Sequence, residues 1–344
     1  MTSEWRDNRI IGGFPTGADG RVHGTFTHNP STLRLSLVDP NLQTIPRGRG
    51  SEVQRWVKEC FVCPPGKVFW ARDYSGIEAV LVGYFAGSPT YVRAAKLGVH
   101  AFLASHLLDD PADWGWSDVD LKGHFAQIKE RDLVVYDTAK RCVHGSNYMM
   151  TPNKMRFEYP ETFASIKDAA RIQGLYHELF PEIRLWHRET CQRVDGTRSR
   201  EEGGAIDPWT LGVCQVRNPF GYLHRFYNVL DWEKIEGKWY STYGTDAKRL
   251  IAFLPQSTAA AIIKKAGREL WYQYPWVGQT MRLWIHDEIF GEVSHADLDT
   301  CLAVSQEVME AEHKELPLDP AWGMGSYLSI GTEAKVGKSW AEMG

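Results

Sequence analysis

The sequence predicts an α+β fold, in which a strand and a later hairpin flank a mostly helical middle. Residues 68–71 form a short apolar run of strand length, and the apolar residues that follow recur at helical spacing. Residues 87–215 are mostly helical in pattern. Residues 281–293 are apolar on both sides of a polar centre, which is typical of a β-hairpin with a tight turn.

Composition and charge limit the number of domains, the size of the core and the kinds of partner that the chain can have. A chain of 344 residues predicts roughly two domains, and 43% hydrophobic residues are enough for a large core. The formal net charge of −4 argues against a chain that binds polyanions over its whole surface. Nucleic-acid contact would therefore be local, or shared with a more basic partner.

The sequence gives no sign of export, of a membrane partner or of a zinc ribbon. No apolar run reaches the ~18 residues that a membrane helix needs, and the N-terminus lacks a basic region followed by an apolar one. Only Cys60 and Cys63 form a C-x-x-C, with no second pair at zinc-ribbon spacing. We therefore predict reduced cysteines in a core near a strand, and a cytoplasmic protein in a bacterium or a phage-infected cell.

The N-terminal region is predicted to be irregular. Residues 1–30 are rich in Gly, Thr and His, as in loops and hairpins, and residues 31–50 contain two prolines that rule out one regular element. Arg34, Arg47 and Arg49 make the second stretch basic. A solvated loop would show the same pattern.

The strand-to-helix junction falls at Asp73, Tyr74 and Ser75. We expect Asp73 at a parallel-type sheet edge that opens into a cleft, with its backbone held by two elements and its carboxylate open to a ligand. The alternative is local: Ser75 and Glu78 would form an S-x-x-E capping box, and Asp73 would only favour the N-terminus of the helix.

Residues 131–150 predict a well-patterned helix. Tyr136, Lys140, His144 and Tyr148 fall within about 120° of one face, and small packable residues lie opposite. Such a face suits a phosphate held by lysine and a base or sugar stacked on tyrosine. An ordinary exposed amphipathic helix has much the same pattern.

The last third of the chain predicts two hairpins around a long helix. The first hairpin centres on EGKWYS at 236–241, and the helix at 246–271 contains Pro255, which predicts a kink or a break. The second hairpin presents His286, Asp287 and Glu288 at its turn. Acids at a hairpin tip are usually a hydrophilic turn, but here apolar strands flank them and would hold the turn rigidly.

Two acids on rigid strand ends, with a Lys and Tyr helix face and local arginines, meet the needs of phosphoryl transfer. That reaction depends on divalent metals bridged by carboxylates and on cations at the departing phosphates. Mg²⁺ prefers hard oxygen ligands, so two aspartates and the substrate phosphates suffice.

Five segments then resemble family A DNA polymerases, in the order of that family. DYSGIE at 73–78 resembles the first palm motif, DYSQIE, and HDE at 286–288 is the third motif. AKRCVHGSNY at 139–148 resembles the fingers helix, R-x-x-x-K-x-x-x-F/Y-G-x-x-Y-G. DPNLQTIP at 39–46 and QSTAAAIIK at 256–264 match DPNLQNIP and QGTAADIIK. The resemblance extends from Arg21 to the end of the chain.

The resemblance implies a right-hand polymerase core with an antiparallel-sheet palm, residues 1–86 and 236–344, and helical fingers, residues 87–235. It implies a DNA-directed DNA polymerase (nucleotidyltransferase) that adds deoxynucleotides to a primer 3′ end by two-metal-ion phosphoryl transfer. Its cofactor would be a pair of Mg²⁺ ions, for which Mn²⁺ can substitute, and its partners primer-template DNA and dNTPs.

Residue roles follow from the same resemblance. It implies Asp73, Asp287 and Glu288 as catalytic residues, and Asp73, Tyr74 and Asp287 as metal ligands. Glu78 would close against the sugar and reject a 2′-hydroxyl.

The remaining implied roles concern the nucleotide and the DNA. Lys140 would hold the triphosphate with help from His100, which resembles the histidine of the family's D-x-H, and Tyr148 would pack at the templating position. His144 stands where an aromatic residue senses the 3′ position of the sugar. The residues implied to contact the minor groove and the primer end, where they test pair shape rather than sequence, are Arg34, Gln256 and His286.

Several positions depart from the family pattern. Tyr136 replaces the phosphate-binding arginine one turn before Lys140. The other replacements are Gly76 for Gln, Met149 for Gly, Leu33 for Gly and Ala252 for Asn. None of these positions is an implied metal ligand, so the departures would affect nucleotide binding and selectivity rather than metal binding.

Family members carry a thumb, and often a 3′–5′ exonuclease, before the first matching segment. Only about 20 residues precede it here. Together with the net charge of −4, this predicts a split, phage-like polymerase whose thumb, with or without an exonuclease, lies on another, more basic subunit. A single-subunit RNA polymerase and a non-catalytic structural subunit of a replication complex remain as alternatives.

Overall fold

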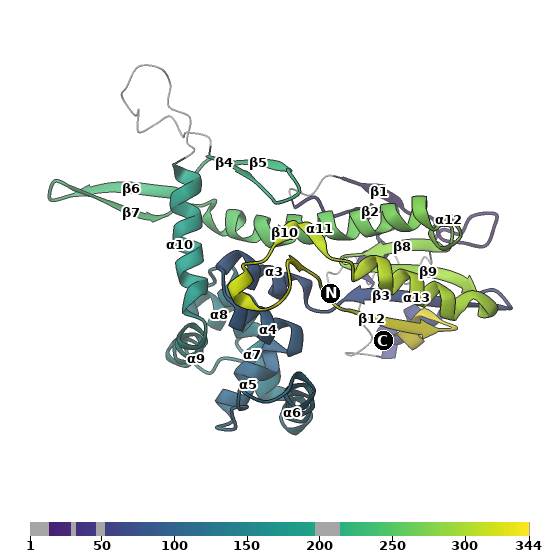
Figure 1. The fold of residues 1–344 in the computed structure, drawn as a ribbon, viewed down its shortest axis with the longest axis horizontal. Coiled ribbons are helices and arrows are strands. Elements are labelled where there is room, and N and C mark those ends of the chain that lie inside the picture. The colour runs from purple at the N-terminus through teal and green to yellow at the C-terminus, as the bar shows by residue number, and fades with distance from the viewer. Residues whose placement is uncertain (1–13, 29–31, 46–51, 197–213, 344) are drawn as a thin grey trace, which may run out of the picture. The chain divides into compact units, whose positions relative to one another are not determined.

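The computed structural model describes residues 14–28, 32–45, 52–196 and 214–343. Arg47 and Arg49 of the predicted basic stretch lie outside these ranges. The chain forms two compact units: unit 1 comprises Met1–Ser75, Ala259–Pro317 and Ser326–Gly344, and unit 2 comprises Gly76–Thr258 and Leu318–Gly325. Unit 1 contains the main sheet and unit 2 most of the helices (Figure 1).

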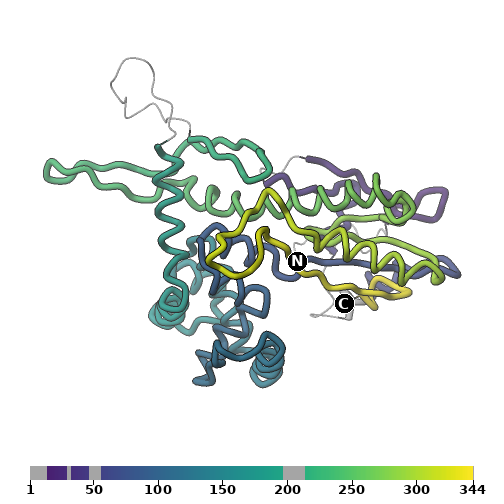
Figure 2. Tube along the Cα trace, in the orientation of Figure 1, coloured from purple at the N-terminus to yellow at the C-terminus, as the bar shows by residue number. Residues whose placement is uncertain are grey.

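The core of unit 1 is a four-stranded sheet in the order β12-β3-β9-β8. Its strands are β3 (Lys67–Tyr74), β8 (Met281–Ile285), β9 (Glu288–Ser294) and β12 (Thr332–Gly337). All three pairings are antiparallel. Figure 2 shows how strands from distant parts of the sequence lie side by side in this sheet. The predicted α+β fold is confirmed.

The expectation of a parallel-type edge at Asp73 is wrong. Asp73 lies near the end of β3, between two antiparallel neighbours that both come from the C-terminal third of the chain. The local apolar run predicted the strand but carried no information on the direction of partners more than 200 residues away.

Successive side chains of β3 point to opposite faces of the sheet. On one face, Arg72 Nε donates to Ser305 Oγ at 3.0 Å and the Tyr74 hydroxyl donates to the Met309 carbonyl at 2.8 Å, both on α13 (Leu298–Met309). On the other face, Phe69 and Phe290 pack at 4.9 Å between ring centroids within a buried apolar cluster. Asp73 therefore emerges on the face opposite α13.

Short elements complete unit 1. They are β1 (Thr25–Thr27), β2 (Ser36–Val38), η1 (Leu42–Thr44), α2 (Glu52–Glu59), α12 (Pro275–Gly278), η2 (His295–Asp297), β10 (His313–Pro317), β11 (Tyr327–Leu328) and η4 (Trp340–Met343). Predicted loops and hairpins before residue 50 agree with β1, β2 and η1, as far as the described residues extend.

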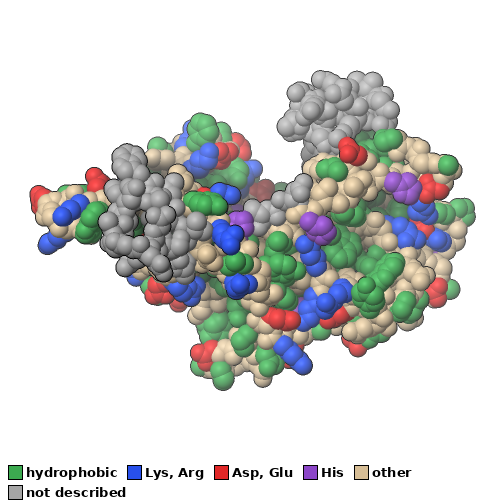
Figure 3. Space-filling view, turned by 90° about the horizontal axis from the view of Figure 1, so that it is seen from above, with side chains coloured by type: hydrophobic (Ala, Val, Ile, Leu, Met, Phe, Trp, Pro, Cys, Tyr) green, Lys and Arg blue, Asp and Glu red, His purple; other side chains and the backbone are tan. Residues whose placement is uncertain are grey.

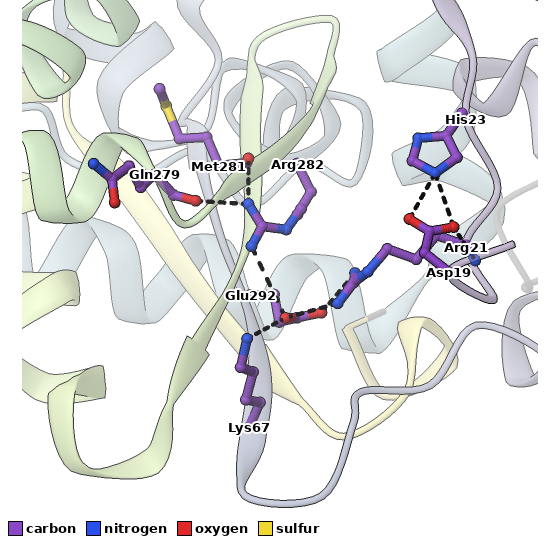
Figure 4. A network of polar contacts seen from close by, with 8 residues as sticks. All are labelled: Asp19, Arg21, His23, Lys67, Gln279, Met281, Arg282 and Glu292. Carbon is purple, nitrogen blue, oxygen red and sulfur yellow. Dashed lines mark hydrogen bonds and ion pairs between the residues drawn. The ribbon is translucent and has the colours of Figure 1, made fainter. Parts of the chain in front are cut away.

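A buried carboxylate ties the N-terminal segment to the sheet (Figure 4). Glu292 on β9 is 2% exposed, and its oxygens accept hydrogen bonds from Arg21 at 2.9 and 3.1 Å and from Lys67 at 2.8 Å. Burial alone would raise the pKa of this carboxyl, but the bonds from Arg21 and Lys67 outweigh it and the pKa is lowered. Figure 4 also shows Arg282 approaching Glu292, at 4.0 Å.

Unit 2 is a helical assembly with two attached hairpins. Its helices are α3 (Ile77–Ala86), α4 (Pro89–Leu97), α5 (Val99–Leu107), α6 (Asp118–Arg131), α7 (Leu133–Asn147), α8 (Pro152–Glu158), α9 (Ile166–Leu179) and α10 (Pro181–Asp195), with η3 (Pro320–Trp322). Asn147, 2% exposed, accepts hydrogen bonds from the hydroxyls of Tyr91 at 2.8 Å and Tyr176 at 2.6 Å. This buried polar centre holds the end of α7 against α4 and α9.

The two hairpins of unit 2 are β4 (Cys214–Arg217) with β5 (Leu223–Phe226), and β6 (Leu230–Ile235) with β7 (Lys238–Tyr243). The second confirms the hairpin predicted around residues 236–241. The following helix, α11 (Ala247–Gln273), continues through Pro255. Of the predicted kink or break, the break therefore does not occur. Proline removes one helical hydrogen bond, and the helix tolerates the loss because Leu254, Pro255 and most of the residues after them are buried.

All six cysteines are free thiols. Four are buried, and burial raises the pKa of Cys142 to about 12. Cys60 is exposed, just after the end of α2, so the prediction of a core position is wrong for it. Within the described ranges, no helix has the length and apolar character needed to span a bilayer. On the face in Figure 3, Lys and Arg side chains are scattered among acidic and apolar ones.

Candidate active site

The turn between β8 and β9 presents the predicted acids, as the sequence indicated. Ile285 pairs with Glu288, so only His286 and Asp287 form the turn. His286 has a φ of 55°, in the left-handed region that costs a side-chain-bearing residue roughly 1–2 kcal/mol. Two packed strands therefore hold the turn in a conformation that the residue types alone would not favour.

The sheet brings three carboxylates of the predicted site together. Asp73 and Glu288 are directly opposed residues of β3 and β9, and the Tyr74 backbone N–H donates to the Asp287 carbonyl at 3.2 Å. Asp73, Asp287 and Glu288 line one cavity of about 190 Å³ with His286. Acids that are more than 200 residues apart in sequence thus share a single hollow.

Two cations neutralise part of this acidic cluster. Lys335 on β12 places its Nζ 2.7 Å from Glu288 Oε2 and 3.4 Å from Asp73 Oδ2. Burial alone would lower the pKa of Lys335, but its bond to Glu288 and the charges of Glu288 and Asp73 raise it. The ammonium of Lys335 is therefore fully charged at neutral pH. The second cation is Arg34, whose Nη2 lies 3.8 Å from Asp287 Oδ1.

Sequence reasoning missed Lys335. A lysine within the short strand segment TEAKVG carries no motif, and only the pairing of β12 with β3 brings it to Asp73. The buried Lys58, which also lines the cavity, was missed for the same reason.

The donor set of the cavity fits a hard divalent cation. Within the described ranges, no group of three or more His, Cys, Asp or Glu side chains is arranged to hold a metal ion by itself. Mg²⁺ is usually bound by one or two carboxylates, with waters and substrate phosphates as its other ligands, and Asp73 and Asp287 supply two carboxylates. The side chain of Tyr74 is buried and bonded to Met309, so only its backbone carbonyl could serve as a ligand.

The capping-box interpretation of Ser75 and Glu78 is wrong. Helix α3 begins at Ile77, its N-cap is Gly76 with a φ of 63°, and no side chain caps it. Ser75 lies one position before the cap, where its hydroxyl cannot close the box. Glu78 instead accepts a hydrogen bond from the Tyr148 hydroxyl at 2.6 Å. Two predicted nucleotide-binding residues are thus in direct contact within unit 2.

Helix α7 confirms the helix predicted over residues 131–150. Asp132 caps it by accepting from the Val135 N–H at 2.9 Å, and the packable face, which includes Cys142 and Val143, is buried. Lys140 lies on the exposed side.

His100 and His144 lie against each other beside this face, with ring centroids 4.9 Å apart. Burial, then the charges of His144 and Lys140, lowers the pKa of His100 to about 3. Burial and Lys140 also lower the pKa of His144, and Glu78 opposes that shift. His100 is therefore neutral at pH 7, and Lys140 contributes to lowering the pKa of both imidazoles.

Two departures from the family pattern have a backbone consequence. Leu33 and Met149 stand where the resembling segments have glycine, and they adopt φ values of 64° and 59°. Leu33 is held there by a hydrogen bond from the Lys264 ammonium to its carbonyl. Both residues therefore adopt the left-handed conformation that glycine favours, although neither is a glycine.

The predicted site residues divide between the two units. Unit 1 contains the predicted metal ligands and their neighbours, which are Arg34, Asp73, Tyr74, His286, Asp287 and Glu288. Unit 2 contains Glu78, His100, Lys140, His144, Tyr148 and Gln256. Gln256 is half-buried on α11, next to Ser257, which accepts a hydrogen bond from Asn218 at 3.1 Å.

Comparison with known proteins identifies the family and the fold of this chain. A family model described as DNA polymerase family A matches residues 10–203, more than half of the chain. The thermostable DNA polymerase I of Thermus caldophilus is 26% identical over 311 residues, 89% of this chain and 32% of that protein. The DNA polymerase I of Chloroflexus aurantiacus is 37% identical over 332 residues, 94% of this chain and 29% of that protein.

The fold is also similar to a solved structure, that of the POL domain of Pol1 from M. smegmatis in complex with DNA primer-template and dNTP. The TM-score is 0.66 over 95% of this chain and 49% of that chain, at 20% sequence identity. The chain spans about a third or less of the length of the curated relatives named here. By the match to the family model, which covers more than half of its residues, the chain belongs to DNA polymerase family A.

Proposed function

We propose that this chain is the catalytic core of a template-directed DNA polymerase that extends a primer 3′ end with deoxynucleotides. The observation that carries the proposal is the cavity shared by Asp73, on β3, and Asp287, in the turn between β8 and β9. Two carboxylates held close together at one end of a rigid sheet are what two-metal phosphoryl transfer requires of a protein.

In the reaction, the primer 3′ oxygen forms a bond to the α-phosphorus of the dNTP, and the bond to the bridging oxygen breaks to release pyrophosphate. Asp73, Asp287 and the Tyr74 carbonyl would hold the ions, with Glu288 beside them. A pair of Mg²⁺ ions, when bound, lowers the pKa of the attacking hydroxyl and neutralises the leaving phosphates. The sheet contributes fixed positions for these oxygens, so little reorganisation is needed during the reaction.

The residues of unit 2 would bind the incoming nucleotide. Lys140 would pair with the triphosphate, and the neutral imidazole of His100 would donate a hydrogen bond rather than a charge. Tyr148 would hold Glu78 against the sugar, since its hydroxyl bonds that carboxylate at 2.6 Å. A fixed carboxylate at this position would exclude a 2′-hydroxyl and so select deoxynucleotides.

The DNA contacts and the domain limits belong to the same proposal. Arg34, Gln256 and His286 would contact the minor groove and the primer end. Residues 1–86 and 236–344 would form the palm, and residues 87–235 the fingers. Arg34 already lies 3.8 Å from Asp287, which supports a position close to the primer terminus.

The test is primer extension under single-turnover conditions, at low salt and with excess protein. We expect Asp73→Asn and Asp287→Asn to reduce the rate by several orders of magnitude with folding intact, and the exposed Asp299→Asn to leave it unchanged. Near-normal extension by either cavity variant would refute the assignment. No extension by the wild-type chain, even with a basic partner subunit present, would favour a structural subunit.

A single-subunit RNA polymerase is the second candidate. The hydrogen-bonded pair of Glu78 and Tyr148 argues against it, because a ribonucleotide needs room where Glu78 would close. Extension with ribonucleotides alone at the rate of deoxynucleotides would reverse this ranking.

A further inference from the structure

Lys335 is a residue of the acidic cavity to which neither the motifs nor the proposed chemistry gives a role. It lies on β12 opposite Ala71 of β3, two residues along the strand from Asp73. Its side chain is 33% exposed, and its Nζ bridges Glu288 at 2.7 Å and Asp73 at 3.4 Å. Carboxylates from two different strands are thereby joined by one ammonium that a third strand supplies.

This ammonium lies beside the oxygens that the proposed function assigns to a divalent ion. An ion bound to Asp73 would lie within a few ångströms of Lys335, and like charges at that distance repel strongly where water is partly excluded. Lys335 therefore weakens divalent binding in the free protein. Glu288, in contrast, is the closer partner of Lys335 and can keep it when an ion takes Asp73.

We propose that Lys335 is a positioning residue that acts as an internal counter-ion: it occupies the Asp73 and Glu288 carboxylates in the free protein and yields Asp73 to the divalent ion when nucleotide phosphates arrive. The inference rests on the proposed function, because it takes Asp73 as a metal ligand. Its consequence is that metal binding is coupled to nucleotide binding, since the phosphates supply both ligands and negative charge that offset Lys335.

The coupling has a measurable form. The free wild-type chain binds divalent ions weakly, and a dNTP with primer-template strengthens that binding. Loss of the Lys335 charge tightens binding of the metal alone by about tenfold or more, equivalent to ~1.4 kcal/mol. The strengthening by dNTP becomes correspondingly smaller.

The experiment is titration of the full chain with Mn²⁺ alone, followed by electron paramagnetic resonance of the unbound ion. Lys335→Met and Lys335→Gln remove the charge, Lys335→Arg retains it, and the exposed Lys338→Met changes the net charge equally outside the cavity. Thermal melting identifies any variant that does not fold. We expect tighter Mn²⁺ binding in the Met and Gln variants, and wild-type affinity in Lys335→Arg and Lys338→Met.

Unchanged or weaker Mn²⁺ binding in both folded charge-removing variants would overturn the proposal, as would equal tightening in Lys338→Met. Failure of the proposed function is recognised separately. If Asp73→Asn and Asp287→Asn bind Mn²⁺ as well as the wild type does, the metal site itself is misassigned.

Discussion

Tyr148→Phe is the substitution that most sharply separates a gating role of Glu78 from a passive one. The hydroxyl it removes donates to Glu78 Oε2 at 2.6 Å, a short charge-assisted hydrogen bond. Such bonds to charged groups contribute about 1.5–3 kcal/mol, and the lower end applies because both side chains are half-buried. If that free energy holds Glu78 against the sugar, discrimination against ribonucleotides falls by about tenfold.

The assay is the ratio of kcat/KM for dNTP to that for rNTP in a double-mutant cycle of Tyr148→Phe and Glu78→Ala. We expect both single variants to lower the ratio, Glu78→Ala by more, and the double variant to match Glu78→Ala alone. Tyr159→Phe, which removes the hydroxyl of a partly buried tyrosine elsewhere in unit 2, should leave the ratio unchanged. Fully additive effects, or no effect of Tyr148→Phe, would refute the claim that Tyr148 acts through Glu78.

Three further predictions concern stability, nucleotide affinity and DNA affinity. Glu292→Gln should lower the free energy of unfolding by about 2 kcal/mol at pH 7. Because the folded-state pKa of Glu292 is lowered, its contribution to stability is present above the ordinary carboxyl pKa and is lost in acid. The melting temperatures of wild type and variant should therefore converge as the pH falls, and a constant difference between them would contradict the prediction. His100→Asn should raise the KM for dNTP with an unchanged pH profile between pH 6 and 8, since a pKa of about 3 keeps His100 neutral there; a new ionisation in that range would show otherwise. With a net charge of −4, the chain alone should bind primer-template weakly and with a steep loss on added salt. Tight, salt-insensitive binding by fluorescence anisotropy would contradict this prediction.

Local pattern was enough to predict the elements that carry the site. The switch at Asp73, the helix over 131–150 and the turn at His286 and Asp287 all depend on residues close in sequence, where apolar periodicity and turn length decide the structure. The same local evidence predicted the S-x-x-E capping box at Ser75, which the structure replaces with a left-handed Gly76 at the N-cap. A four-residue motif cannot tell which of its residues begins the helix.

The features that sequence reasoning missed are all long-range. Lys335 lies 262 residues from Asp73 along the chain, and it reaches that residue only through the order of strands in the sheet. The bond of Tyr148 to Glu78 spans 70 residues, and that of Arg21 to Glu292 spans 271. These contacts depend on tertiary packing, which a single sequence without covariation does not encode in any readable local pattern.

The location of divalent ions in a ternary complex is the most direct test of the central claim. A crystal of the chain with a dideoxy-terminated primer-template, a dNTP and Mn²⁺, measured at the manganese absorption edge, is predicted to show two anomalous peaks between the carboxylates of Asp73 and Asp287. Peaks bound only to phosphates, or to acids outside this cavity, would contradict the account.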